Sequence, residues 1–317
     1  MKLGLCVFFN YPFPANMPIW RDLYGGIFSE IIFIQPLVRS AERDVVTVYR
    51  AAFNFAGYFS DARTALESMD VDAVVFTGDD CVLNPALFGS DFATRFRWGP
   101  DVSGFIPEVL PFAHEKWLGN RHKLSVLGRF IGDYGLYDQR IQGWQQHLPD
   151  PARLLERYRS IHVAVDDLRF PTDEEIEKLT GTQREIIRRT FRGNSSAPQP
   201  YPLSYAISDF FIVAKPHLAE FCHQAGLLAA MNVFPEAAVP MALVSLDGTL
   251  RQARDCGLAF QWTYGRNRDA TFFVPTSIDE LRDCIRKQPE NSIFIHPVKM
   301  SSIRRAEANI TSDTPQP

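Results

Sequence analysis

The first 80 residues alternate strand-like and helix-like segments, and this alternation constrains the fold more than any other feature. Apolar, Val-rich runs predict strands over residues 2–10, 44–53 and 71–78. Apolar residues at helical or mixed spacing predict helices over residues 27–38 and 60–69. Ser60 or Asp61 is expected to cap the second helix. The order predicts an α/β fold with a mostly parallel central sheet flanked by helices.

The length and composition are those of one main domain with a sizeable core. The chain has 317 residues, of which 46% are hydrophobic. We expect residues 1–92 to form one half of this domain and residues 93–300 the other half. Residues 301–317 form a polar tail that we expect to be disordered.

Net charge and cysteine content exclude several classes of protein. A formal charge of −4 gives no general attraction to nucleic acid or to anionic membranes, so any phosphate binding must be local. The five cysteines form no close pair, which argues against a disulfide framework or a zinc knuckle and favours the cytoplasm. No apolar run is long enough to predict a transmembrane segment.

The second half has a less regular pattern. Residues 91–150 show no clean period and are expected to be irregular, and the polar, Pro-rich residues 192–202 are expected to form a loop. Strands are expected within residues 204–216 and 292–300, and helices over residues 217–231 and 278–288.

Glycine-rich phosphate-binding motifs are missing. The first strand is not followed by the G-x-G-x-x-G fingerprint, and the chain contains no G-x-x-x-x-G-K-[ST] loop. Dinucleotide-binding and P-loop folds are therefore disfavoured, and a nucleotide would have to be bound in another way.

Two adjacent acids, Asp79 and Asp80, follow the apolar run Val74-Val75-Phe76. A solvated turn is one interpretation. Another is a ligand site, because ligands of open α/β sheets bind at the carboxyl ends of strands. Mg²⁺ and related hard cations are bound by one or two carboxylates together with phosphate oxygens.

Near the end of the chain, His296 follows three apolar residues, and Lys299 comes three positions later. A histidine at a strand end can simply be a structural residue. It can also complete the coordination of a metal, while the ammonium group of a lysine neutralises a phosphate.

Two further acids are candidates for catalysis. Asp209 begins the run SDFFIVAKP, and Glu236 is expected in the first turn of a short helix. Acids at helix N-termini are often only stabilising. Either carboxylate could instead accept a proton from a sugar hydroxyl.

Taken together, three segments resemble those of glycosyltransferases with the GT-A fold, as found in bacteria. They are the strand ending in GDD followed by VLNP, the block SDFFIVAKP…FPEAAVP, and the late FIHPVK. The resemblance implies transfer of a sugar from a nucleotide-diphosphate donor, with UDP-sugars favoured, to a saccharide, glycoconjugate or other hydroxyl acceptor. Residues 1–92 would then bind the nucleotide sugar, and residues 93–300 would bind the acceptor and carry catalysis.

The resemblance also implies roles for individual residues. Asp80 and His296 would hold Mn²⁺ or Mg²⁺, and Glu236 or Asp209 would be the catalytic base. The donor would be contacted by residues at the ends of the early strands and near the late histidine: Phe9, Asn10, Tyr11, Tyr49, Arg50, Asp79 and Lys299.

The chain departs from the family motif at one position. Cys81 stands where a third acid is often found, and a thiol is a poor ligand for hard cations. Two alternatives therefore stay open: a nucleotidyltransferase acting on a sugar phosphate, and a non-catalytic sugar-binding relative.

Overall fold

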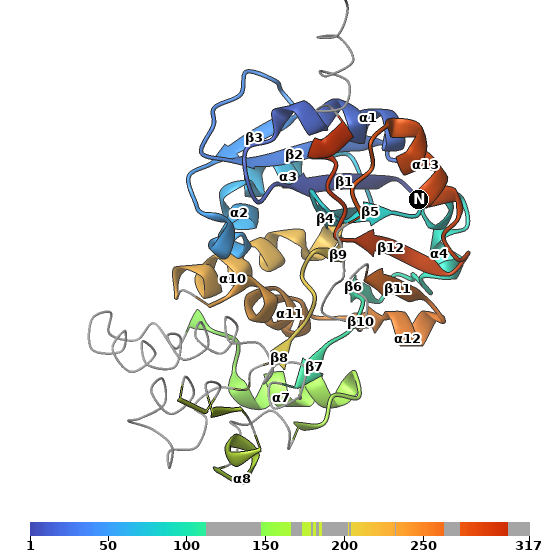
Figure 1. The fold of residues 1–317 in the computed structure, drawn as a ribbon. Helices are drawn as coiled ribbons and strands as arrows, with labels where there is room; N and C mark the ends of the chain where they lie inside the picture. Colours follow the sequence, from blue (N-terminus) through green and yellow to red (C-terminus); the bar gives the residue numbers. More distant parts are fainter. Residues whose placement is uncertain are drawn as a thin grey trace, which may run out of the picture.

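A seven-stranded sheet forms the centre of the computed structural model (Figure 1). The strand order is β10-β6-β9-β4-β1-β2-β3. Neighbouring strands are parallel except at β9, which runs antiparallel to both β4 and β6. The α/β class and the mostly parallel sheet flanked by helices are thereby confirmed. The structure describes residues 1–111, 147–165, 173–178, 180–181, 184–185, 202, 204–231, 233–262 and 273–303.

The strands of the central sheet come from both predicted halves of the chain. They are β1 (Leu3–Phe8), β2 (Glu30–Pro36), β3 (Val45–Val48), β4 (Ala73–Gly78), β6 (Val102–Ile106), β9 (Phe210–Ala214) and β10 (Thr249–Gln252). A three-stranded sheet contains β5 (Val82–Leu83), β11 (Ala259–Trp262) and β12 (Ser292–His296), and β7 (Leu110–Pro111) pairs with β8 (Ser204–Tyr205).

The described α-helices are α1 (Met17–Tyr24), α2 (Ala56–Asp61), α3 (Arg63–Ser68), α4 (Phe92–Arg95), α7 (Pro151–Ser160), α8 (Asp173–Glu177), α10 (Leu218–Ala230), α11 (Pro235–Ser245), α12 (Ala253–Cys256) and α13 (Ile278–Arg286). Short 3₁₀ turns are η1 (Pro14–Asn16), η2 (Ala52–Asn54), η3 (Pro85–Leu87) and η6 (Lys215–His217).

Each face of the sheet is covered by its own apolar layer, because successive side chains of a strand point to opposite faces. Phe8 and Phe76 pack with residues of α2, α10 and α11 on one face. Val7 and Val75 pack with residues of α1, α4, α13 and β12 on the other. Every residue of β1 and β4 is buried, so packing on both faces fixes the position and register of these two central strands.

The small sheet places the end of the chain beside the middle of the sequence. Strand β5 follows the acid pair, and its Val82 and Leu83 pair antiparallel with Ile295 and Phe294 of β12. The predicted strand within residues 292–300 is confirmed, and it ends at His296, next to the turn that carries Asp80.

Two expectations about regular structure were wrong. Residues 27–38 contain strand β2 rather than a helix, since consecutive buried residues of this run pair with β1 and β3. Residues 91–111 are not irregular throughout, because β6 lies between β9 and β10. Both partners of β6 lie more than 100 residues further along the chain, so local periodicity could not reveal it.

A third expectation failed at a helix cap. Neither Ser60 nor Asp61 begins a helix, because both belong to α2, which starts at Ala56, and α3 follows from Arg63. The predicted loop at residues 192–202 and the tail beyond residue 303 lie outside the described residues, except for Pro202.

Candidate metal centre

Three side chains from distant parts of the sequence meet at the carboxyl edge of strand β4. Asp80 lies in the turn after β4, and Asp209 immediately precedes β9. Because β9 is antiparallel to β4, its beginning lies beside the end of β4, and the Gly78 amide donates to the Asp209 carbonyl over 2.8 Å. The strand order therefore brings the two acids to one edge.

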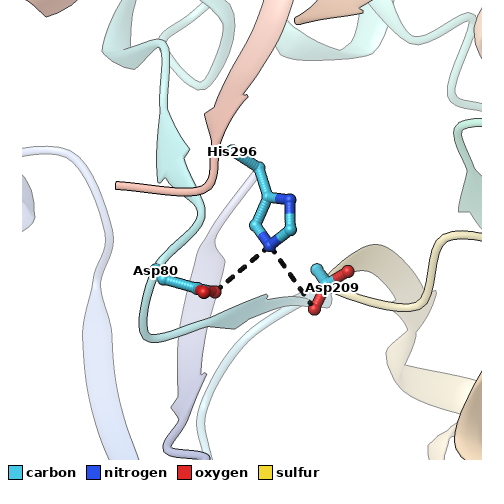
Figure 2. A group of neighbouring side chains, drawn as sticks. All are labelled: Asp80, Asp209 and His296. Atoms are coloured by element: carbon cyan, nitrogen blue, oxygen red, sulfur yellow. Dashed lines mark ion pairs between the residues drawn. The ribbon is translucent and has the colours of Figure 1, made fainter. Parts of the chain in front are cut away.

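His296 completes this group from the end of β12. Its Nε2 lies 3.3 Å from Oδ1 of Asp80 and 3.8 Å from Oδ1 of Asp209, so one ring nitrogen faces both carboxylates (Figure 2). The turn is also fixed through the backbone, because the Val298 amide donates to the Asp80 carbonyl over 2.8 Å.

A lysine lies at the solvent side of the same group. Nζ of Lys299 is 4.0 Å from Oδ2 of Asp80, and about half of the lysine side chain is exposed. A cationic group in this place can contact an anionic ligand that approaches Asp80 from solvent.

The opposite charges of the two carboxylates and the imidazolium stabilise one another. Burial opposes ionisation of Asp80, but the close contact with His296 and the charges of His296 and Lys299 outweigh it, so the pKa of Asp80 is lowered. Burial likewise disfavours the imidazolium, but the charge of Asp209 and the contacts with Asp80 raise the pKa of His296. Without a metal, the two carboxylates thus favour the protonated form of His296.

The same donor set fits a divalent cation. Asp80, Asp209 and His296 each offer a ligand atom, and these atoms lie within 4.8 Å of one another. Two carboxylate oxygens and one imidazole nitrogen suit Mn²⁺, and such a set of ligands can also bind Mg²⁺ or Zn²⁺. Because an imidazole nitrogen binds a metal only in its unprotonated form, protons and the cation would compete for His296.

Asp79 has a different environment from its neighbour. Its side chain is only 7% exposed, and its Oδ1 accepts a 3.2 Å hydrogen bond from the amide of Asn10. Burial and the negative charge of Asp80 raise the pKa of Asp79 to about 7. Asp79, the residue before Asp80, therefore links the end of β4 to the end of β1 through this hydrogen bond.

Cys81 does not belong to the cluster of possible ligands. Its side chain is fully buried in the apolar layer, and burial raises the pKa of its thiol. Asp209 instead offers the third possible ligand atom. The sequence indicated an acid directly before an apolar strand, but only the antiparallel direction of β9 shows that this acid lies beside Asp80.

The residues predicted to contact a donor lie at the same edge, in different environments. Phe9 is fully buried and packs near Phe33, so its side chain cannot stack on a ligand. Tyr11 is 62% exposed and Tyr49 is exposed as well. Arg50 makes a two-point ion pair with Asp61 at 2.7 and 2.9 Å.

Glu236 lies in the first turn of α11, as predicted, and is half-buried. Its carbonyl accepts a 2.8 Å hydrogen bond from the Ala206 amide, three residues before Asp209. Burial, together with the charges of Glu108 and Glu236, raises the pKa of Tyr205. Glu236 thus lies beside the segment that leads to Asp209 but is not among the three clustered ligands.

Tyr58 is a residue near the site that the sequence did not suggest. Its hydroxyl donates to the Arg50 carbonyl over 3.3 Å, and burial together with the charge of Asp79 raises its pKa. It lies in α2, and no motif in the sequence marks it.

Comparisons with known proteins assign no family to the chain. No protein-family model matches it, and no curated protein is significantly similar to it. Among the described residues, no helix is long and apolar enough to cross a membrane.

Proposed function

We propose that this protein is a metal-assisted glycosyltransferase that uses a nucleotide-diphosphate sugar. The observation that carries the proposal is the convergence of Asp80, Asp209 and His296 at the carboxyl end of β4, with Lys299 at its rim. This edge is where ligands of α/β sheets bind. The Rossmann-like arrangement of β1–β4 is compatible with the GT-A fold implied by the sequence resemblance.

The charges in the site suit the departure of a diphosphate. When bound, Mn²⁺ or Mg²⁺ would neutralise the negative charge that develops on the leaving phosphate. Lys299 would contact the diphosphate, since its ammonium group lies 4.0 Å from Asp80 and about half of its side chain is exposed. The partly buried carboxylates of Asp80 and Asp209 would keep the cation at the strand end.

The donor and acceptor would approach from different sides of this centre. Asn10 and Tyr11 follow β1, next to β4, and would line the nucleotide side. Glu236 lies beside the segment before Asp209 and would accept the proton of the acceptor hydroxyl. Since Asp209 is a ligand in this arrangement, Glu236 is the preferred base. A UDP-sugar is the donor that the sequence resemblance favours.

A nucleotide-release assay with UDP-, GDP- and CDP-sugars, with Mn²⁺, Mg²⁺ or chelator, tests the proposal. We expect release of nucleoside diphosphate from one donor class that depends on the cation. Asp80→Asn should lower the rate about 100-fold or more, because it removes a charged ligand without touching the core. Asp72→Asn is the matched control, since exposed Asp72 lies at the opposite end of β4.

Two results would contradict the proposal. One is an Asp80→Asn rate equal to that of the wild type. The other is release of pyrophosphate from a nucleoside triphosphate and a sugar phosphate, which would assign the site to nucleotidyl transfer.

A further inference from the structure

Exposed apolar side chains gather on three neighbouring loops. Eight large hydrophobic residues are exposed in the described part of the chain, and six of them follow β1, β2 or β3. These are Tyr11, Phe13, Leu37, Val38, Tyr49 and Phe53. Because the three strands are parallel and adjacent, their loops lie side by side at the carboxyl edge. Clustered apolar exposure of this kind marks an interaction surface.

The outer two loops form what we call the edge patch: Leu37, Val38, Tyr49 and Phe53. They are joined by a 2.8 Å hydrogen bond from the Leu37 amide to the Val48 carbonyl. All four side chains are between 45% and 73% exposed. Tyr11 and Phe13 follow β1, which lies between the patch and β4.

Leu37 is held outward by an unfavourable backbone conformation. Its φ is +66°, and the Val38 amide donates to the Pro36 carbonyl over 2.7 Å, which closes a γ-turn around Leu37. A branched apolar residue with positive φ is strained, and strain of this kind is often retained at functional sites. Folding alone gives no reason to present a leucine to solvent at this point.

Positive charge predominates around the edge patch. Arg39 and Arg43 are exposed and make no ion pair with any described residue. The acids of the same loop are already engaged, because Arg21 pairs with Glu42 at 2.5 Å and with Asp44 at 2.9 Å. Residues 49–54, which form the other loop of the patch, contain no acidic residue.

We propose that the edge patch docks on a lipid bilayer that carries anionic headgroups. Leucine, valine and aromatic side chains enter the boundary between headgroups and acyl chains, and nearby arginines bind anionic lipid. Self-association is disfavoured, because a two-fold contact through this patch would bring the unpaired arginines of both copies together. The overall charge of −4 does not oppose such local attraction at physiological ionic strength.

Docking would bring the metal centre close to the membrane. The patch follows β2 and β3, which lie two and three strands from β4, roughly 10–15 Å away at the usual strand spacing. A consequence that rests on the proposed function is that the acceptor hydroxyl is carried by a lipid.

Vesicle sedimentation tests the docking itself. The full chain is mixed with phosphatidylcholine vesicles, or with vesicles in which a third of the lipid is phosphatidylglycerol, with chelator and without nucleotide. We expect binding to the anionic vesicles that weakens with added salt. Leu37→Asn and Phe53→Ser should each lower the partition coefficient at least about fivefold, given the apolar area lost. Arg39→Gln and Arg43→Gln should each lower it about fivefold.

Control measurements distinguish a variant that has lost the docking surface from one that has failed to fold. Asn tolerates positive φ, so Leu37→Asn should keep or raise the melting temperature. Val274→Ser and Arg159→Gln change an exposed apolar residue and an exposed arginine outside the patch, and should bind as the wild type. Nucleotide release with a water-soluble acceptor should be unchanged in Leu37→Asn, so failure of docking and failure of catalysis are distinguishable.

Three outcomes would overturn the proposal. They are equal partition of the wild type with and without anionic lipid, equal losses in the patch and control variants, and a concentration-dependent dimer that Leu37→Asn abolishes. The last would assign the patch to a second copy of the chain.

Discussion

The pKa values of the adjacent residues Asp79 and Asp80 are shifted in opposite directions, and the cause lies in the groups that surround each carboxylate. Asp80 faces His296 and Lys299, whose charges stabilise its ionised form. Asp79 is directed toward the buried end of β1, where a single backbone amide is its hydrogen-bond donor among the described contacts. One acid is therefore suited to bind a cation, and the other carries an electrostatic cost in the metal-free protein.

This difference predicts a pH-dependent effect of Asp79→Asn on the metal-free protein. Since the folded-state pKa of about 7 lies above the usual value of 3.8, the contribution of Asp79 to stability is full below pH 4 and is lost as the pH rises through 7. Asn keeps an acceptor for the Asn10 amide without the charge. Above pH 7 the variant should be more stable by about 2 kcal/mol, less than the shift alone implies at 1.36 kcal/mol per unit.

Urea unfolding in the presence of chelator, at a series of pH values, measures this effect. At low pH the two proteins should have the same free energy of unfolding within the cost of the substitution itself. A variant that is less stable at every pH would show that the carboxylate of Asp79 is favourably paired.

At the level of secondary-structure elements, the direction and pairing of the strands decide which candidate site residues lie together. The apolar runs of β1, β4, β9 and β12 were recognisable in the sequence because each is short, continuous and buried. Strands β2 and β6 were not, since β2 has mixed spacing and β6 depends on distant partners. The antiparallel direction of β9 was equally invisible, and it is what turns Asp209 from a candidate base into a candidate ligand.

Lys215 provides a test of how the elements are fixed. Just after β9, its Nζ donates to three carbonyls at the end of α3: those of Leu66, Glu67 and Met69, at 3.3, 2.7 and 2.6 Å. A cation at this end of a helix also complements the helix dipole. Lys215→Met should lower the free energy of unfolding by about 1–2 kcal/mol, because it leaves these carbonyls without their donor.

Chemical denaturation is the appropriate measurement, and Lys287→Met is the matched control. Lys287 is exposed at the end of α13, and its ammonium has no hydrogen bond to a described residue. If both variants lose the same stability, the cap on α3 contributes nothing specific.

Across the whole molecule, the sequence predicted the α/β class and expected Asp80, His296 and Lys299 at one site, but it did not place Asp209 with them. Asp80 and His296 were candidates because each follows an apolar run, and the resemblance to GT-A enzymes implied their roles as ligands and that of Lys299 as a donor contact. Their contact depends on the pairing of β5 with β12 across more than 200 residues. Burial of Phe9 and the ion pair of Arg50 depend on packing, which local sequence does not encode.

The central claim is that Asp80, Asp209 and His296 bind one divalent cation, and calorimetric titration with Mn²⁺ tests it most directly. We predict one saturable site per chain, with affinity lowered at least about tenfold in Asp80→Asn, Asp209→Asn and His296→Ala. Asp72→Asn and His223→Ala, which change exposed residues elsewhere, should bind Mn²⁺ as the wild type does. Wild-type protein that binds no Mn²⁺, or Asp209→Asn that binds it unchanged, would contradict the account.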